Sequence, residues 1–143
     1  MQAFTLLEMS IVLMVLMALI STSLFVSKKT DDWKLGRKAS EALRTVYSAQ
    51  RMYLADNPTV SVSTLTAALL IPYLPNLDNT KTPPTTLEAC FTPPIKSLTG
   101  DTLLFVVNDP NSTPPYFKTG SGARYDPSAT PPNYTDSLWD VGQ

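Results

Sequence analysis

The feature that most constrains this chain is an apolar run close to its start. From Phe4 to Val26 the sequence reads FTLLEMSIVLMVLMALISTSLFV, and Glu8 is the only charged residue in it. As a helix rising about 1.5 Å per residue, the run is roughly 35 Å long, enough to cross a hydrocarbon layer of about 30 Å. Because the run is apolar on every face, lipid or other helices must surround it.

Glu8 is the exception within this run. A carboxylate in the apolar region of a membrane costs roughly 2.5–3.5 kcal/mol on insertion scales, and such residues tend to be functional. No basic residue lies near Glu8 in the sequence. Its partner would therefore come from another chain, from a free amino terminus or from water. The alternative is that Glu8 sits in the headgroup zone, and the residues alone leave both interpretations open.

A signal peptide or a plain anchor would account for the apolar run less well. A cleaved secretory signal peptide has an apolar core of about 7–15 residues, followed by small residues at a cleavage site. Here the run is longer, and Lys28 and Lys29 follow it. A plain single-pass anchor accounts for the length of the run and leaves the placement of Glu8 without a reason.

The stretch Phe4–Glu8, FTLLE, and the following Met9–Val12, MSIV, resemble the prepilin cleavage motif of type IV pilins and type II secretion pseudopilins. The resemblance implies that a prepilin peptidase cuts between Ala3 and Phe4 and methylates the new amino group of Phe4. It also implies that Glu8 pairs with the amino terminus of a neighbouring subunit during assembly. Phe4 and Glu8 are thus the expected assembly residues, and Ala3 and Phe4 the expected processing residues.

Residues 1–3 are expected to be the remnant of a leader. Ala3 stands where the family usually has glycine, and Met1–Ala3 carries no basic residue. Family leaders are basic, which keeps them in the cytoplasm by the positive-inside rule, whereas Lys28 and Lys29 favour the opposite orientation. We therefore expect a basic leader upstream, or a mature chain that keeps these three residues.

After the membrane and polymerisation helix over residues 4–27, the pattern changes. Over residues 28–57 apolar side chains recur every three or four positions, which predicts an amphipathic helix with one face packed on the rest of the chain. This stripe consists of Leu35, Ala39, Ala42, Leu43, Val46, Ala49 and Tyr53. Pro58 predicts the end of the helix, because the residue before a proline is driven out of the α region.

Residues 58–143 contain all 13 prolines of the chain, which predicts a C-terminal globular, pilin-like domain with long loops. Within it, the sequence predicts a helix over 63–70, a loop over 77–86, a possible strand at 89–91, and a hairpin with strands at 102–107 and 116–119. The expected class is α+β, with the long helix packed on a small antiparallel sheet. The pilin resemblance implies the same fold.

Composition excludes several classes of site. The net charge of -1 predicts no nucleic-acid partner. Histidine is absent and Cys90 is the only cysteine, so a histidine-dependent catalytic set, an internal disulfide and a Cys/His metal cluster are excluded. Cys90 is expected to be a buried apolar residue or an intermolecular bridge.

We expect no enzymatic activity, no cofactor and no metal. Asp126, Asp136 and Asp140 are weak candidates for a calcium site, but their spacing fits no EF-hand loop.

The leading hypothesis is a structural subunit of a type IV pilus-like filament, a helical homopolymer. It implies residence in the bacterial inner membrane before assembly, then a periplasmic or extracellular filament, with the prepilin peptidase and the pilus assembly machinery as partners. One alternative is a pseudopilin of a type II secretion system. The second alternative is a membrane-anchored binding domain that never polymerises, which predicts an uncleaved N-terminus.

Overall fold

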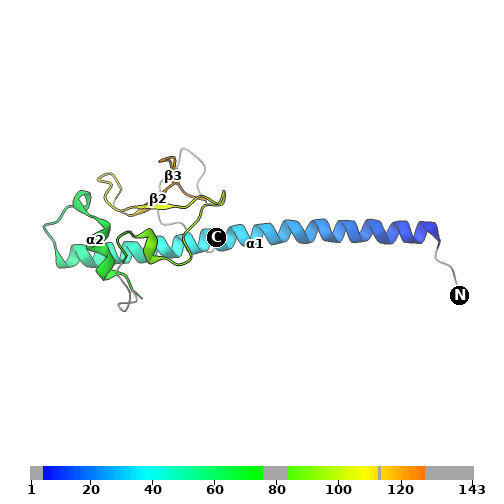
Figure 1. Cartoon of the computed structure of the whole chain (residues 1–143), viewed down its shortest axis with the longest axis horizontal. Coiled ribbons are helices and arrows are strands. Elements are labelled where there is room, and N and C mark those ends of the chain that lie inside the picture. The colour runs from blue at the N-terminus through cyan, green and yellow to red at the C-terminus, as the bar shows by residue number, and fades with distance from the viewer. Residues whose placement is uncertain (1–4, 76–83, 113, 128–143) are drawn as a thin grey trace. The chain divides into compact units, whose positions relative to one another are not determined.

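A computed structural model describes residues 5–75, 84–112 and 114–127. The fold is α+β, with one long helix, α1, and a three-stranded antiparallel sheet (Figure 1). The chain forms two compact units, which meet in sequence between Lys34 and Leu35. Both the fold class and the long helix were predicted from the sequence.

Helix α1 runs from Leu6 to Asp56. It begins where the Thr5 side chain accepts a hydrogen bond from the backbone N–H of Glu8, with Thr5 Oγ1 3.3 Å from that nitrogen, which satisfies one of the free donors of a helix start. The last residue, Asp56, precedes Asn57 and Pro58, so the helix ends where the sequence predicts. No proline interrupts it, and the 51 residues of α1 form one element.

The second part of α1 supplies one wall of the core. Ala39, Ala42, Leu43, Val46 and Ala49 are all buried, which confirms the centre of the predicted stripe. Leu43 packs in a cluster with Ile95, Leu103 and Phe117. Val46 and Ala49 pack in a second cluster together with side chains from the short helical segments and from the residues that flank them: Leu65, Leu70, Ile71, Leu74 and Leu87.

The sheet lies along this second part of α1 and has the order β1-β2-β3 (Figure 1). Strand β1, Leu104–Val106, pairs with β2, Tyr116–Lys118, with Phe105 opposite Phe117. This is the hairpin that the sequence predicts. Strand β3, Arg124–Tyr125, pairs with β2 and was not predicted from the sequence.

Side chains and a neighbouring segment occupy the outer edge of β1. The N–H of Leu103 donates to the carbonyl of Ile95 at 3.0 Å, and the N–H of Phe105 donates to Glu88 Oε1 at 2.8 Å. Beyond the strand, the Gln50 side chain donates to the carbonyl of Val107 at 3.3 Å. An uncovered edge would be a template for pairing with other chains, so these contacts limit sheet extension at β1.

Two predicted elements differ from the structure. The helix predicted over 63–70 is divided into a 3₁₀ turn, Val62–Thr64, and α2, Ala67–Leu70, followed by a second 3₁₀ turn, Ile71–Tyr73. The break falls at Leu65 and Thr66, which have extended backbone. The strand predicted at 89–91 is wrong, because Glu88–Cys90 form a 3₁₀ turn. Residues 76–83 of the predicted 77–86 loop lie outside the described residues.

Candidate functional site

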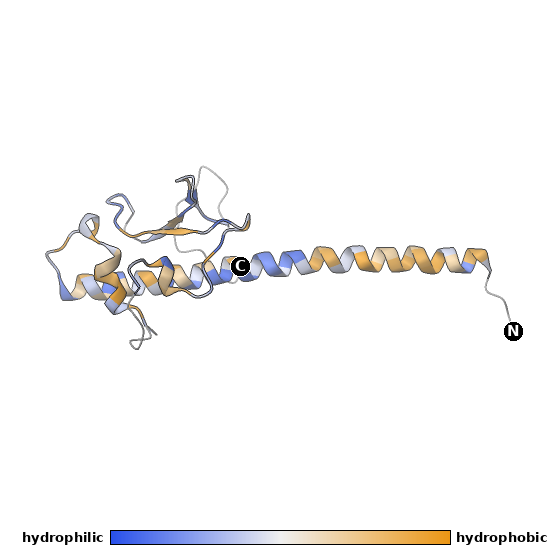
Figure 2. Cartoon of the chain, in the orientation of Figure 1, coloured by the Kyte–Doolittle hydropathy of each residue, from blue (hydrophilic) through white to orange (hydrophobic). Residues whose placement is uncertain are grey.

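The first part of α1 is an apolar helix whose residues are exposed. Every residue from Leu6 to Val26 is exposed, including Leu7 at 69%, Met17 at 70% and Phe25 at 65%. This part of the helix consists mainly of apolar residues, and mainly polar residues follow it (Figure 2). The helix is long and apolar enough to cross a membrane. Removing so much apolar surface from water is strongly favourable, so lipid or other protein must cover it.

Three of the four hydroxyl side chains in this segment, those of Ser10, Ser21 and Thr22, bond to carbonyl groups of the helix itself. Ser10 donates to the carbonyl of Leu7 at 2.8 Å, Ser21 to that of Met17 at 2.8 Å, and Thr22 to that of Leu19 at 2.9 Å. In an apolar surrounding an unpaired hydroxyl is costly, whereas one bonded within its own helix is tolerated. These three residues therefore need no partner from lipid or from another chain.

Among the residues that the structure describes, the Glu8 carboxylate has no such partner. It lies exposed in the first turn of α1, and among residues 5–75, 84–112 and 114–127 no ion pair involves its carboxylate. The positive end of the helix dipole at the N-terminus favours a negative charge there. The first turn of α1 thus presents one carboxylate, without an ion-pair partner in the described part of the chain, at the start of an apolar helix.

Thr5 is a residue of this site that was not predicted from the sequence. Its side chain caps the helix at the amide of Glu8, and Thr5 and Glu8 have the T-x-x-E spacing of a capping box. That spacing is the signal that could have identified Thr5. The cap fixes the first turn, and with it the height of Glu8 on the helix. The predicted processing residues Ala3 and Phe4 lie outside the described residues.

Charged residues follow the apolar segment directly. Lys28, Lys29, Asp31 and Asp32 are all exposed; we call these four residues the charged collar. The ammonium of Lys29 lies over the ring of Phe25, 5.8 Å from its centroid. Asp31 forms an ion pair with Lys34 at 3.7 Å. The collar therefore marks one end of the segment that lipid or protein must cover.

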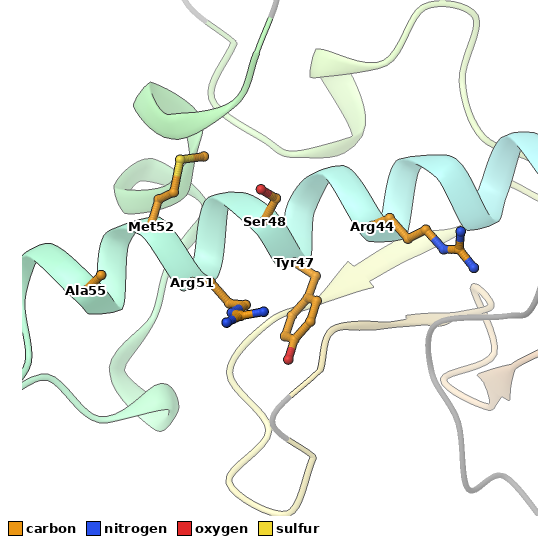
Figure 3. A pocket seen from close by; sticks show the side chains of 6 residues that line it. All are labelled: Arg44, Tyr47, Ser48, Arg51, Met52 and Ala55. Atoms are coloured by element: carbon orange, nitrogen blue, oxygen red, sulfur yellow. The ribbon is translucent and has the colours of Figure 1, made fainter.

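In the second compact unit, α1 also has an exposed face. A shallow hollow of about 410 Å³ is lined by Arg44, Tyr47, Ser48, Arg51, Met52 and Ala55 (Figure 3). The Arg51 guanidinium lies 5.9 Å from the Tyr47 ring centroid. All six residues belong to one helix, so the hollow is a surface of α1 and not a cleft between elements.

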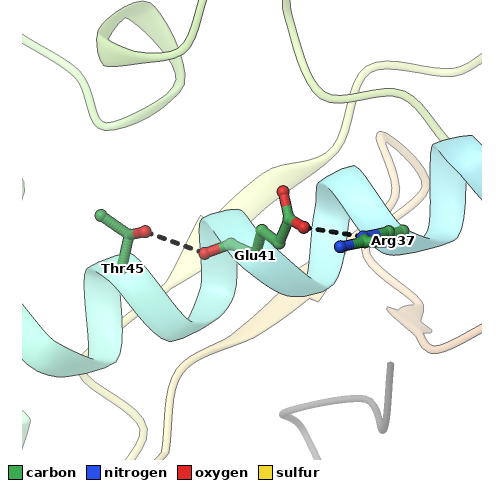
Figure 4. Close-up of polar contacts among 3 residues, drawn as sticks. All are labelled: Arg37, Glu41 and Thr45. Atoms are coloured by element: carbon green, nitrogen blue, oxygen red, sulfur yellow. Dashed lines mark hydrogen bonds and ion pairs between the residues drawn. The ribbon is translucent and has the colours of Figure 1, made fainter. Parts of the chain in front are cut away.

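Towards the start of this unit, side chains on the exposed face of α1 contact groups one turn away on the same helix. Arg37 Nε lies 2.9 Å from Glu41 Oε1, and the Thr45 hydroxyl donates to the carbonyl of Glu41 at 2.9 Å (Figure 4). Arginine and glutamate four positions apart stabilise an exposed helix by a few tenths of a kcal/mol. These contacts support the helix and form no site for a ligand.

The remaining candidates do not form a site within the described residues. Asp126 is half-buried, while Asp136 and Asp140 lie outside the described part of the chain; no group of three metal-ligating side chains occurs in the part described. Cys90 is half-buried beside the core. Burial, and then the nearby charge of Glu88, raise the pKa of its thiol. A raised pKa keeps the thiol protonated and makes it a poor nucleophile.

No family model matches the chain, and no curated protein and no solved structure matches it either.

Proposed function

We propose that this chain is a structural subunit of a type IV pilus-like filament. It enters the membrane by the first part of α1 and polymerises through that same helix. The observation that carries the proposal is the carboxylate of Glu8, which forms no ion pair with the described residues and is the only charge from Leu6 to Val26. The resemblance of FTLLE to the prepilin motif supports it.

A membrane anchor needs only apolar length, and Glu8 makes insertion less favourable. A filament gives the carboxylate a role, because an amino terminus from a neighbouring copy can neutralise it. A buried charge pair is tolerated where a lone buried charge is not. Glu8 then sets the height at which one subunit docks on the next, since any other height leaves a charge unpaired.

The same arrangement serves the two branches of the family, the pilus at the cell surface and the pseudopilus of a type II secretion system. Their subunits share the helix and the glutamate, and differ in where the filament grows. The location of the filament therefore decides between these two functions.

The test is negative-stain microscopy of material sheared from the cell surface, with mass spectrometry of the N-terminus of the recovered subunit. We expect filaments whose subunit begins with N-methylated Phe4. Filaments confined to the periplasm, with the same N-terminus, would identify a pseudopilin. An uncleaved N-terminus with no filaments in either place would refute polymerisation and indicate an anchored binding domain.

A further inference from the structure

The charged collar has an unusual order of charges. Two lysines, Lys28 and Lys29, come first, and two aspartates, Asp31 and Asp32, follow. On a helix, residues three and four positions apart lie on the same side, so Lys28 shares a side with Asp31 and Asp32. Lys28 thus lies about 4.5–6 Å along the helix axis from Asp31 and Asp32, at 1.5 Å per residue. The collar therefore has a positive end and a negative end.

Within one chain these opposite charges do not pair. Among residues 5–75, 84–112 and 114–127, no ion pair joins Lys28 or Lys29 to an acidic residue. The order of the residues accounts for this, because an acidic residue placed before a basic one pairs better on a helix than the reverse. Asp31 follows that preference and pairs forward with Lys34 at 3.7 Å. Both lysines therefore remain available to another chain.

We propose that the charged collar is a self-recognition surface, which docks a second, parallel copy of this chain displaced along the helix axis by three or four residues. Two copies at the same height would bring lysine against lysine and aspartate against aspartate. A displacement of three residues brings Lys28 and Lys29 of one copy level with Asp31 and Asp32 of the second copy. A displacement of four brings Lys28 level with Asp32.

This inference rests on the proposed function and adds a second contact to it. Phe4 and Glu8 are four positions apart, as are Lys28 and Asp32. When Glu8 of one copy is level with the amino terminus of another, Asp32 of the first copy is therefore level with Lys28 of the second. Both ends of the apolar segment favour the same displacement in the same direction. An exposed ion pair contributes little by itself, but this contact repeats at every subunit.

The first experiment makes each collar carry one sign of charge. One variant carries Lys28→Asp with Lys29→Asp, and a second carries Asp31→Lys with Asp32→Lys. Each alone should give less than a tenth of the wild-type filament yield, while the two expressed together should restore it. Lys96→Asp, at an exposed lysine of the second compact unit, is the matched control and should assemble normally. Membrane insertion is measured in parallel by resistance to carbonate extraction.

The second experiment measures the displacement. In chains carrying Cys90→Ser, Lys28→Cys is placed in one tagged copy and Asp32→Cys in a differently tagged copy. Oxidation of the mixed filaments should give more disulfide between unlike copies than between two copies that carry Lys28→Cys. A majority of disulfides between like copies would show packing at equal height and would overturn the proposal.

The possible outcomes distinguish failure of the proposed function from failure of self-recognition by the collar. If the wild-type chain forms no filaments, the proposed function fails and this inference fails with it. If wild-type filaments form and both single-sign variants also assemble alone, the inference fails and the proposed function stands. If only the all-basic variant assembles alone, the collar binds anionic lipid headgroups, and self-recognition is refuted.

Discussion

Replacing Glu8 with valine separates the two roles that we propose for the apolar helix, membrane insertion and filament assembly. The substitution removes the only charge between Leu6 and Val26 and leaves the Thr5 cap, whose partner is the backbone amide of residue 8. On insertion scales the loss of a carboxylate favours the membrane by roughly 2.5–3.5 kcal/mol. Membrane insertion should therefore be retained or improved.

Assembly should change in the opposite direction. If the amino terminus of the neighbouring copy is left without its carboxylate, one charge stays buried and unpaired. Breaking a buried pair in this way costs about 3 kcal/mol, roughly a hundredfold in the affinity of each subunit contact. Filament yield should fall below detection, while the subunit accumulates in the membrane. Glu8→Gln should show the same defect, since it keeps the size of the side chain and removes its charge.

The assay compares the carbonate-resistant membrane fraction with the yield of sheared filaments for each variant. Ser10→Val is the matched control, because it also removes a polar group near the helix start. The Ser10 hydroxyl bonds to the carbonyl of Leu7 within the helix, so its loss should leave filament yield unchanged. Filaments at wild-type yield from the Glu8→Val chain would refute the reasoning.

Three further predictions concern the second compact unit, measured by urea unfolding of the full chain in mild detergent. Leu43→Ala should lower the free energy of unfolding by about 3 kcal/mol, because Leu43 is fully buried. The control Leu24→Ala, at a residue that is 64% exposed, should leave the free energy of unfolding unchanged. Equal losses in the two variants would contradict the assignment of the core. Burial and the hydrogen bond to Asp109 raise the pKa of Tyr116 from 10.0 to about 12. The contribution of Tyr116 to the free energy of unfolding should be complete below pH 10 and be lost as the pH rises to about 12. If a Tyr116→Phe chain loses as much stability over the same pH range, the loss does not come from ionisation of Tyr116. Glu88→Ala should cost about 1.5 kcal/mol and speed hydrogen exchange at the β1 amide that Glu88 caps, whereas Glu88→Gln, which keeps an acceptor oxygen, should cost less than half of that.

Much of the fold follows from local sequence signals. The apolar stripe identified the buried face of α1, and Pro58 identified its end at Asp56. Strands were predicted at 102–107 and 116–119 because each is a short apolar or aromatic run bounded by proline or turn residues, and β1 and β2 lie within these ranges. In these cases the local preference and the tertiary packing agree.

The missed elements depend on contacts between distant residues. The stretch Ala89–Phe91 has the composition of a short strand, yet Cys90 bonds back to the carbonyl of Leu87 in a turn, and that turn holds Glu88 against the edge of β1. Strand β3 has only two residues and pairs with β2, so no periodicity could show it. The burial of Gln50 was missed for the same reason, because the carbonyl that accepts its hydrogen bond belongs to Val107, 57 positions away.

Within the candidate site, the sequence identified Glu8 because a lone charge in an apolar run is visible without a structure. It did not show that the lysines of the collar lack acidic partners within the described part of the chain. That property depends on side-chain geometry, and the ion pair between Asp31 and Lys34 was needed to see it.

The central claim is that Glu8 of one subunit pairs with the amino terminus of its neighbour. It is tested most directly by treating intact filaments with dicyclohexylcarbodiimide, an apolar reagent that joins a carboxylate to an amine in contact with it. Filaments made from isotopically light and heavy subunits allow mass spectrometry to distinguish links between chains from links within one chain. The account predicts a peptide in which Glu8 is joined by an amide bond to the N-terminal residue of a different chain. Filaments in which Glu8 carries only the carbodiimide adduct, with every amino terminus unlinked, would contradict it.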